Sequence, residues 1–380
     1  MIPYGRQEID EEDVRAVTEA LSSDWLTTGP KVDEFEKALA DYVGVKYAVA
    51  VSSGTAALHC AMYAVGIVQG DEVIVPAMTF AATANGAVYQ GGVPVFADVD
   101  AETLLLDTRS VEAKITTRTK AVVAVDYAGH PCDYDSLREI CQRHSLVLVA
   151  DGCHALGGEY KGRRVGSLAD LTVFSFHPVK HITTGEGGAI TTDNDELYRR
   201  LRLFRNHGMT VDFRQRAEAG SWHYEIVDLG YNYRITDIQC ALGCSQLKKL
   251  PVFLKRRQEI AGRYDAFFAD IPQINPLAVR DNVRHAYHLY VVRVDFDALA
   301  LDRKTLFKEM RDKGVEVNVH YIPVHLHPYY RKRFGLGPGL CPVAEAAYER
   351  IVSLPLCPKL TDGEVQYVMN AIQEVIKTPG

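Results

Sequence analysis

The chain has 380 residues, 47% of them hydrophobic, which is enough to bury the core of one large domain and a smaller one. The formal net charge of -7 leaves no basic footprint for nucleic acid, and the eight cysteines lack the C-x-x-C spacing of a metal site. The first residues show no secretory signal and no apolar run is long enough to span a bilayer, so we expect a cytoplasmic protein without a membrane partner.

The first predicted element is a helix from its N-cap Asp10 to Leu21, and residues 27–30 (Thr-Thr-Gly-Pro) interrupt it. From Tyr47 onward, short apolar runs rich in β-formers alternate with helical patterns. Several runs lack polar alternation, as expected for strands buried on both faces. This predicts an α/β fold with a mixed, mostly parallel seven-stranded sheet. The candidate strands are residues 47–51, 72–75, 94–97, 121–125, 146–150, 171–176 and 189–191.

The pattern changes after about residue 250. We predict a charged helix over residues 255–268, strands over 288–294 and 315–321 with a helix from Asp302 between them, and a last helix with a capping box at Thr361 and Glu364. The chain is therefore predicted to form a large α/β domain over residues 1–250, including the N-terminal segment, and a smaller α+β domain over residues 251–380.

Lys180 is the most informative residue of the chain. It follows the predicted strand 171–176 and is surrounded by hydroxyls and glycines. A lysine that is desolvated in such a place has a lowered pKa, which leaves its amine free to attack a carbonyl. We expect this carbonyl to be the aldehyde of pyridoxal 5'-phosphate (PLP). Since most lysines are solvated surface charges, this interpretation depends on the other parts that a PLP site needs.

An acid is needed for the pyridine nitrogen of PLP, and the candidate is Asp151 at the end of a predicted buried strand. His154, three residues later, is positioned to bond the ring hydroxyl or to lie over the ring. Phe80 follows another strand end and offers a flat contact for the ring. Taken singly, each has an ordinary alternative: a helix cap, a structural histidine, a core phenylalanine.

Phosphate donors are predicted in the turn that follows the strand 47–51. Ser53, Gly54 and Thr55 open a helix there, where free N–H groups and close backbone approach favour an anion, and Ser175 adds a hydroxyl. A generic strand-to-helix turn is the alternative. The order of the parts is more specific than any one of them: a Gly-Thr turn, an aromatic, a strand-end acid with a histidine, then the serine and Lys180 on the next strand.

These residues resemble the PLP-dependent sugar-nucleotide aminotransferases of the DegT type, a branch of the aspartate-aminotransferase-like fold (fold type I), over essentially the whole chain. The stretches that carry the resemblance are residues 25–30, 52–55, 79–80, 151–157, 174–188 and 230–239. Within this branch the chain is similar to the aminotransferases of the pseudaminic-acid pathway, through Tyr4 and residues 177–184 and 318–325.

The resemblance implies a role for each matching residue. Lys180 would form the Schiff base and transfer the proton, with Asp151 on the pyridine nitrogen and His154 near the ring. The phosphate would be held by Gly54, Thr55 and Ser175, next to Ser53, and by Asn232 of a neighbouring subunit, which implies a homodimer with the active site at its interface. The implied substrate-binding residues are Tyr4, Asp24, Trp25, Leu26, Thr27, His320, Tyr321, Ile322 and Pro323.

The resemblance also implies a reaction. L-Glutamate would be the amino donor, and C4 of a UDP-linked 4-keto-6-deoxy N-acetylhexosamine would be aminated, giving UDP-4-amino-4,6-dideoxy-N-acetyl-beta-L-altrosamine. A related dehydratase branch has histidine at the position of Lys180, so the lysine favours transamination. Three alternatives stay open: another nucleotide keto-sugar (C3 or C4, dTDP or GDP), a PLP lyase or desulfurase, and a non-enzymatic sensor of PLP or sugar nucleotide.

Overall fold

The computed structural model describes residues 1–377, and its centre is a seven-stranded sheet with the strand order β1-β9-β8-β5-β4-β2-β3. The strands from β8 to β3 pair in parallel, whereas β9 pairs antiparallel with both β1 and β8. The predicted mixed, mostly parallel sheet is confirmed. Its strands are β1 (Tyr47–Val51), β2 (Glu72–Pro76), β3 (Val93–Ala97), β4 (Thr119–Val125), β5 (Val147–Asp151), β8 (Leu171–Ser175) and β9 (Gly188–Thr192).

All seven predicted strands form, and their ends differ from the prediction by at most two residues. Consecutive residues of β4, β5 and β8 are buried, which requires cover on both faces of the sheet because neighbouring side chains point to opposite sides. The helices are α1 (Glu11–Leu21), α2 (Pro30–Val43), α3 (Gly54–Val65), α4 (Ala81–Tyr89), α5 (Thr108–Lys114), α6 (Tyr134–His144), α7 (Asp195–Arg205), α8 (Phe213–Glu218), α9 (Asp237–Phe268), α10 (Arg303–Asp312), α11 (Pro328–Phe334), α12 (Pro342–Arg350) and α13 (Asp362–Lys377).

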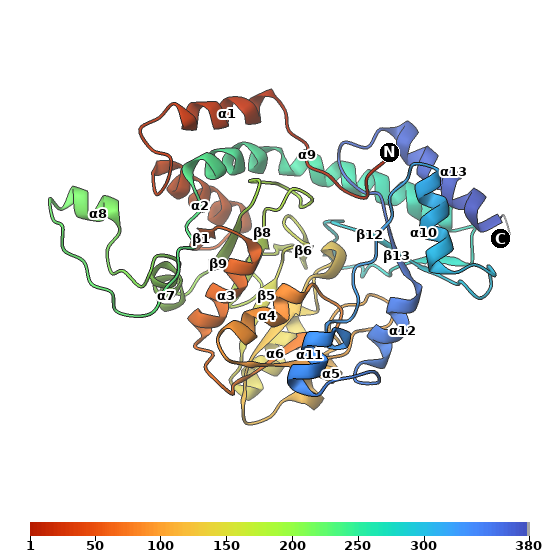
Figure 1. Cartoon of the computed structure of the whole chain (residues 1–380), viewed down its shortest axis with the longest axis horizontal. Helices are drawn as coiled ribbons and strands as arrows, with labels where there is room; N and C mark the ends of the chain where they lie inside the picture. The colour runs from red at the N-terminus through yellow and green to blue at the C-terminus, as the bar shows by residue number, and fades with distance from the viewer. Residues whose placement is uncertain (378–380) are drawn as a thin grey trace.

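The helix α9 corrects one prediction. The charged helix expected over residues 255–268 is only its second half, because α9 begins at Asp237 and continues through Pro251. Its first half is buried nearly all round, packed against α1 and α2, and so lacks the charged face that marks the second half. Figure 1 shows α9 running along one side of the molecule from α2 to α10 and α13. The predicted boundary near residue 250 lies inside this helix, and the division into two domains stays a prediction.

The C-terminal part has its own sheet, with the order β10-β12-β13, formed by β10 (Ile274–Pro276), β12 (Tyr290–Val294) and β13 (Ile351–Leu354). A second hydrophobic cluster lies between this sheet, the end of α9 and α13. Two short pairings involve β6 (Glu159–Tyr160), β7 (Arg163–Arg164) and β11 (Val283–Arg284). Residues 378–380 of the predicted small domain lie outside the described residues.

The helix caps of the C-terminal part form as predicted from the sequence. Asp302 caps α10 through the amide of Thr305, and Thr361 and Glu364 form the predicted reciprocal bonds at the start of α13. The predicted strand over residues 315–321 is wrong. That segment makes only single bridges, from Val315 to Ile2 and from Asn318 to Ser353, and then leaves the edge of β13 to enter the central cavity.

Figure 1 shows that α8 and the segments on either side of it project from the body of the molecule. Large apolar side chains are exposed there, among them Phe213, Trp222, Ile226 and Leu229. We call residues 207–231 the projecting arm. Within residues 1–377, none of the helices combines the length and the apolar character needed to cross a membrane.

Candidate active site

A cavity of about 530 Å³ opens at the carboxyl ends of β5 and β8. It lies where ligands bind in open α/β sheets. Eleven of the predicted site residues line it, although they come from distant parts of the chain: Tyr4, Ser53, Gly54, Thr55, Phe80, Asp151, His154, Ser175, Lys180, His320 and Tyr321.

Lys180 follows the end of β8, where its backbone amide donates to the carbonyl of His177 at 2.8 Å. Its Nζ atom lies 3.3 Å from Nε2 of His288. Burial lowers the pKa of Lys180, while the neighbouring Cys153 and Asp151 act in the opposite direction and Arg257 acts in the same one. The amine is therefore closer to its neutral, nucleophilic form than that of a solvated lysine.

Asp151 is the last residue of β5, and its carboxylate is only 6% exposed. Its Oδ2 atom accepts a hydrogen bond from the hydroxyl of Thr83 at 2.7 Å, and its Oδ1 atom accepts from the backbone amide of Cys153 at 3.2 Å. Two donors from α4 and from the turn after β5 thus fix the carboxylate at the cavity wall.

His154 is buried in the turn that follows Asp151. Its Nε2 atom pairs with the hydroxyl of Tyr321 at 3.0 Å, and its Nδ1 atom is buried without a hydrogen-bond partner among residues 1–377. Its ring centroid lies 4.4 Å from that of His288. Burial, with Lys180 as the second cause, holds the pKa of His154 well below its usual range, so the ring is neutral. An unpartnered buried nitrogen in the cavity wall suits a ligand that brings its own polar group.

The turn between β1 and α3 forms part of the cavity wall. Ser53 caps α3 by accepting from the amide of Ala56 at 3.1 Å. A Cβ atom at Gly54 would come within 2.9 Å of the Cβ atom of Ser175, so only glycine leaves room between the turn and β8. Free backbone N–H groups at a helix start, with hydroxyls on both sides, suit a phosphate.

Two aromatic contacts, Phe80 with Tyr321 and Tyr4 with His320, line another part of the cavity, which we call its mouth. The Phe80 ring is 59% exposed, with its centroid 5.9 Å from that of Tyr321, and the Tyr4 ring lies 5.4 Å from that of His320. The Nδ1 atom of His320 bonds the hydroxyl of Ser353 on β13 at 2.8 Å. A buried lysine, a fixed carboxylate, a phosphate-sized turn and a flat aromatic surface therefore meet in one cavity, and these residues fit PLP.

The remaining predicted residues do not line this cavity. Asn232 is exposed on the arm side of the molecule, where it bridges Asn206. The stretch Asp24, Trp25, Leu26 and Thr27 is also exposed, Ile322 is 41% exposed and Pro323 is buried behind Tyr321. Within one chain, these residues are not brought together with Lys180.

Sequence reasoning missed His288. The strand predicted over residues 288–294 begins with His288. In the structure, His288 precedes β12, and its side chain lines the cavity beside Lys180. Its only sequence signal is a second histidine, His285, three residues earlier, and such a pair is more often structural. Asn318 and Glu186 also line the cavity without having been predicted.

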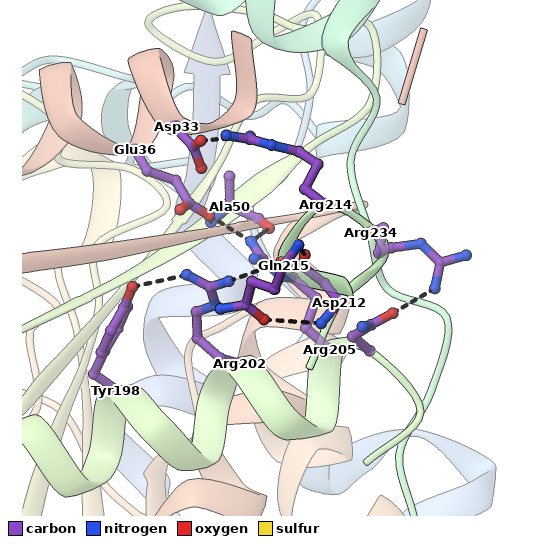
Figure 2. Close-up of polar contacts among 11 residues, drawn as sticks. Asp33, Glu36, Ala50, Tyr198, Arg202, Arg205, Asp212, Arg214, Gln215 and Arg234 are labelled. Carbon is purple, nitrogen blue, oxygen red and sulfur yellow. Dashed lines mark hydrogen bonds and ion pairs between the residues drawn. The ribbon is translucent and has the colours of Figure 1, made fainter. Parts of the chain in front are cut away.

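A second cavity, of about 650 Å³, lies beside α7 and is lined by four arginines: Arg199, Arg202, Arg205 and Arg234. Figure 2 shows most of these side chains already engaged. Arg205 pairs with Glu36 and donates to the carbonyl of Ala50, and Arg202 pairs with Asp212 at 3.3 Å.

The contacts around the second cavity tie the arm to the body. Arg214 of α8 pairs with Asp33 of α2 at 2.5 Å, and Arg234 donates to the side chain of Asn206 at 2.7 Å. Most of these arginines therefore fix the position of the segment between α7 and α9, which carries Asn232.

The sequence matches the DegT/DnrJ/EryC1/StrS aminotransferase family over residues 7–373. The spore coat polysaccharide biosynthesis protein SpsC of Bacillus subtilis (strain 168) is 44% identical over 378 residues, which cover 99% of this chain and 97% of that protein. Spr1654 of Streptococcus pneumoniae, named a sugar aminotransferase, is 37% identical, with 99% of each chain covered and a TM-score of 0.94 for its PMP form. Helicobacter pylori PseC, an aminotransferase involved in pseudoaminic acid biosynthesis, is 36% identical, with 99% of each chain covered and a TM-score of 0.91.

Proposed function

The chain belongs to the DegT/DnrJ/EryC1/StrS aminotransferase family, and from this premise we propose that it transfers an amino group from L-glutamate to a nucleotide-linked 4-keto-6-deoxy sugar. The predicted fold type I, enzyme class and cofactor are confirmed, since the chain is a PLP-dependent sugar aminotransferase. The donor, the exact sugar and the role of each residue belong to the proposal.

The observation that carries the proposal is the meeting of Lys180, Asp151 and the turn at Gly54 in one cavity. PLP, when bound, supplies an electron sink for the removal of a proton from carbon. Lys180 would hold the cofactor at its aldehyde carbon, and its neutral amine would take a proton from one carbon and return it to another. Asp151, fixed by Thr83, would hold the proton of the pyridine nitrogen, and the neutral ring of His154 would contact the cofactor ring.

The remaining cofactor contacts follow from position. Ser53, Gly54, Thr55 and Ser175 bind the phosphate at the cavity wall, and Phe80 offers its exposed ring as a flat contact. The mouth is lined by Tyr4, His320 and Tyr321, which we assign to the sugar-nucleotide. Ile322 and Pro323 continue this segment but do not line the cavity.

The acceptor is proposed to be a UDP-linked 4-keto-6-deoxy N-acetylhexosamine, so that the product is UDP-4-amino-4,6-dideoxy-N-acetyl-beta-L-altrosamine, as in pseudaminic acid biosynthesis. The likeness to PseC over nearly the whole chain supports this choice. The likeness to SpsC, at higher identity, supports a second candidate: another nucleotide keto-sugar that enters a different polysaccharide. Both acceptors would react through the same lysine. They would differ in their contacts with the residues at the mouth of the cavity.

We also propose a cytoplasmic homodimer whose active sites lie at the subunit interface. Asn232 and residues 24–27 are exposed and do not line the cavity of their own chain, as expected if they complete the site of a second subunit. The exposed apolar side chains of the projecting arm support this, because a solvated patch of this kind marks an association surface. Asn232 would then reach the cofactor phosphate of the neighbouring subunit.

The function is tested by mixing the purified protein with PLP and L-glutamate and measuring released 2-oxoglutarate. A panel of keto-sugar nucleotides, differing in nucleotide and in the position of the keto group, is then offered to the glutamate-treated protein. Amination of UDP-4-keto sugars alone supports the first candidate, and amination of other acceptors supports the second. Binding of PLP without any release of 2-oxoglutarate would favour a lyase or a sensor instead.

The shared site is tested by mixing two inactive variants, Lys180→Ala and Asn232→Ala. In a dimer with intermolecular sites, mixed dimers contain one site with both wild-type residues and regain activity. If each chain carries a complete site, mixing restores nothing.

A further inference from the structure

Arg257 is a positive charge that α9 buries beneath the active site. The residue is 1% exposed, and among residues 1–377 no carboxylate oxygen lies within 4.0 Å of its guanidinium. Its Nη1 atom donates to three backbone carbonyls instead, those of Tyr287 at 3.1 Å, His288 at 3.3 Å and Leu356 at 3.0 Å, and its Nε atom has no acceptor in the part of the chain that the structure describes. A buried charge without an opposite charge is costly, which points to a role beyond packing.

These bonds join the segments that frame the active-site cavity. The carbonyls of Tyr287 and His288 belong to the segment that places the His288 imidazole 3.3 Å from Lys180 Nζ. The amide of Leu356 donates to the carbonyl of Tyr4 at 3.0 Å, and Tyr4 lines the mouth. Arg257 lines neither cavity itself, so any effect it has on the reaction is indirect.

The charge of Arg257 persists at neutral pH, although burial lowers the pKa of its guanidinium to about 10. Its field reaches the residues around Lys180: after burial, Arg257 is among the causes that lower the pKa values of Lys180, His181 and His288.

The histidines and the cysteine that surround Lys180 carry no charge. The imidazoles of His154, His288 and His320 are neutral, because burial and Lys180 itself lower their pKa values. The Cys153 thiol is neutral too, since burial raises its pKa. Asp151 favours the ammonium form of Lys180, and Arg257 opposes it. Three further charged residues share a cavity with Lys180: Glu186 lines the active-site cavity, and the oppositely charged Arg6 and Glu8 line a small cavity beside it.

We propose that Arg257 is a positioning residue for Lys180: it fixes the backbone of His288, whose imidazole holds the lysine nitrogen, and its uncompensated charge offsets Asp151 to keep the amine available. Asp151 would thus attract a proton toward the ring of the bound cofactor. In the same cavity, the amine of Lys180 would stay neutral and able to take a proton from carbon.

The test measures the pKa of Lys180 directly, in the full chain freed of cofactor. Competitive acetylation with acetic anhydride over a pH series, read by mass spectrometry of the peptide that holds Lys180, gives the fraction of neutral amine. The variants are Arg257→Met, Arg257→Lys and the matched control Arg256→Met. Arg256 is the preceding residue of α9 and pairs with Asp362 at 2.8 Å, away from the cavity. Circular dichroism and PLP binding report whether each variant is folded.

We expect the Lys180 pKa to rise by about one unit in Arg257→Met, which is a tenfold loss of neutral amine at neutral pH, and to stay at the wild-type value in Arg257→Lys and Arg256→Met. A folded Arg257→Met with an unchanged Lys180 pKa would overturn the proposal, and so would an equal rise in Arg256→Met. If Arg257→Met does not fold, the Lys180 pKa of the wild type and of Arg257→Lys tests the proposal. A Lys180 pKa equal to that of a solvated lysine in either protein contradicts the role of Arg257.

Discussion

The hydroxyl of Thr83 donates to Oδ2 of Asp151 at 2.7 Å, in a place where both side chains are buried. Thr83 in turn pairs with the hydroxyl of Thr79 at 2.8 Å. This short chain of hydroxyls, one from the start of α4 and one just before it, holds the carboxylate that faces the cofactor cavity. The orientation of Asp151 therefore depends on a helix that contributes no charged group to the site.

Thr83→Val removes this hydrogen bond while keeping the shape of the side chain. We expect PLP affinity to fall roughly tenfold, about 1.4 kcal/mol, because the freed carboxylate is no longer fixed toward the ring nitrogen. Equilibrium dialysis of PLP against the variant measures this change.

The matched control is Thr172→Val on β8. Thr172 is also fully buried, but its hydroxyl has no hydrogen-bond partner within the described residues 1–377, so its removal is expected to leave PLP affinity unchanged. An equal loss of affinity in both variants would show that Thr83 acts through general stability and not through Asp151.

Lys180→Ala and Lys180→Arg are expected to abolish turnover while leaving the fold intact. Alanine has no amine, and arginine stays protonated and cannot bond the aldehyde carbon. Released 2-oxoglutarate and the circular dichroism spectrum are the measurements. Lys161→Ala, at an exposed lysine that pairs with Asp135, is the control and keeps full activity. Normal turnover in either Lys180 variant would contradict the assignment of this residue.

Gly54→Ala is expected to weaken PLP binding strongly, by roughly a hundredfold or more, because a Cβ atom would meet Ser175 at 2.9 Å where the phosphate is to lie. Gly262→Ala in α9 is the control, since a Cβ atom there meets nothing within 4 Å and alanine favours helix. Titration with PLP, together with thermal unfolding of the cofactor-free chain, separates a local effect from a global one. A normal PLP affinity in Gly54→Ala would place the phosphate elsewhere.

The sequence allowed the sheet and most of the cavity to be predicted because their signals are local. Buried strands such as residues 121–125 appear as continuous apolar runs, and strand-end residues such as Asp151 and Lys180 must gather at one edge of a parallel sheet. Resemblance supplied the remaining positions. The part that failed depends on contacts between distant segments.

The segment 315–321 shows why. Its apolar residues predict a strand, but its only β-bridges among residues 1–377 are to the single residues Ile2 and Ser353, which no local pattern reveals. His288 was missed for the same reason, since its proximity to Lys180 comes from the packing of the C-terminal part against the large sheet. Arg257 looks like any other residue of a charged helix until the buried carbonyls around it are known.

The protein is expected to become less stable as pH decreases, because it buries neutral histidines. Burial lowers the pKa values of His59, His130 and His320 from the ordinary 6.5 to about 4. Between these two values the unfolded chain binds more protons than the folded one, so the free energy of unfolding decreases as pH falls through this window and is unaffected by these groups above it. For His130, which is almost fully buried, the loss amounts to at most roughly 3 kcal/mol.

Urea unfolding at a series of pH values across this window measures the slope. His130 accepts from the amide of Arg280 at 3.1 Å and pairs with the carbonyl of Pro131 at 2.7 Å, so His130→Gln keeps a donor and an acceptor but cannot be charged. We expect this variant to lose less stability on acidification than the wild type, whereas His144→Gln, at an exposed histidine, changes nothing. If His130→Gln and the wild type follow the same pH dependence, the buried imidazole does not contribute to acid lability, because a residue that never takes up the proton cannot reproduce the linkage of one that does.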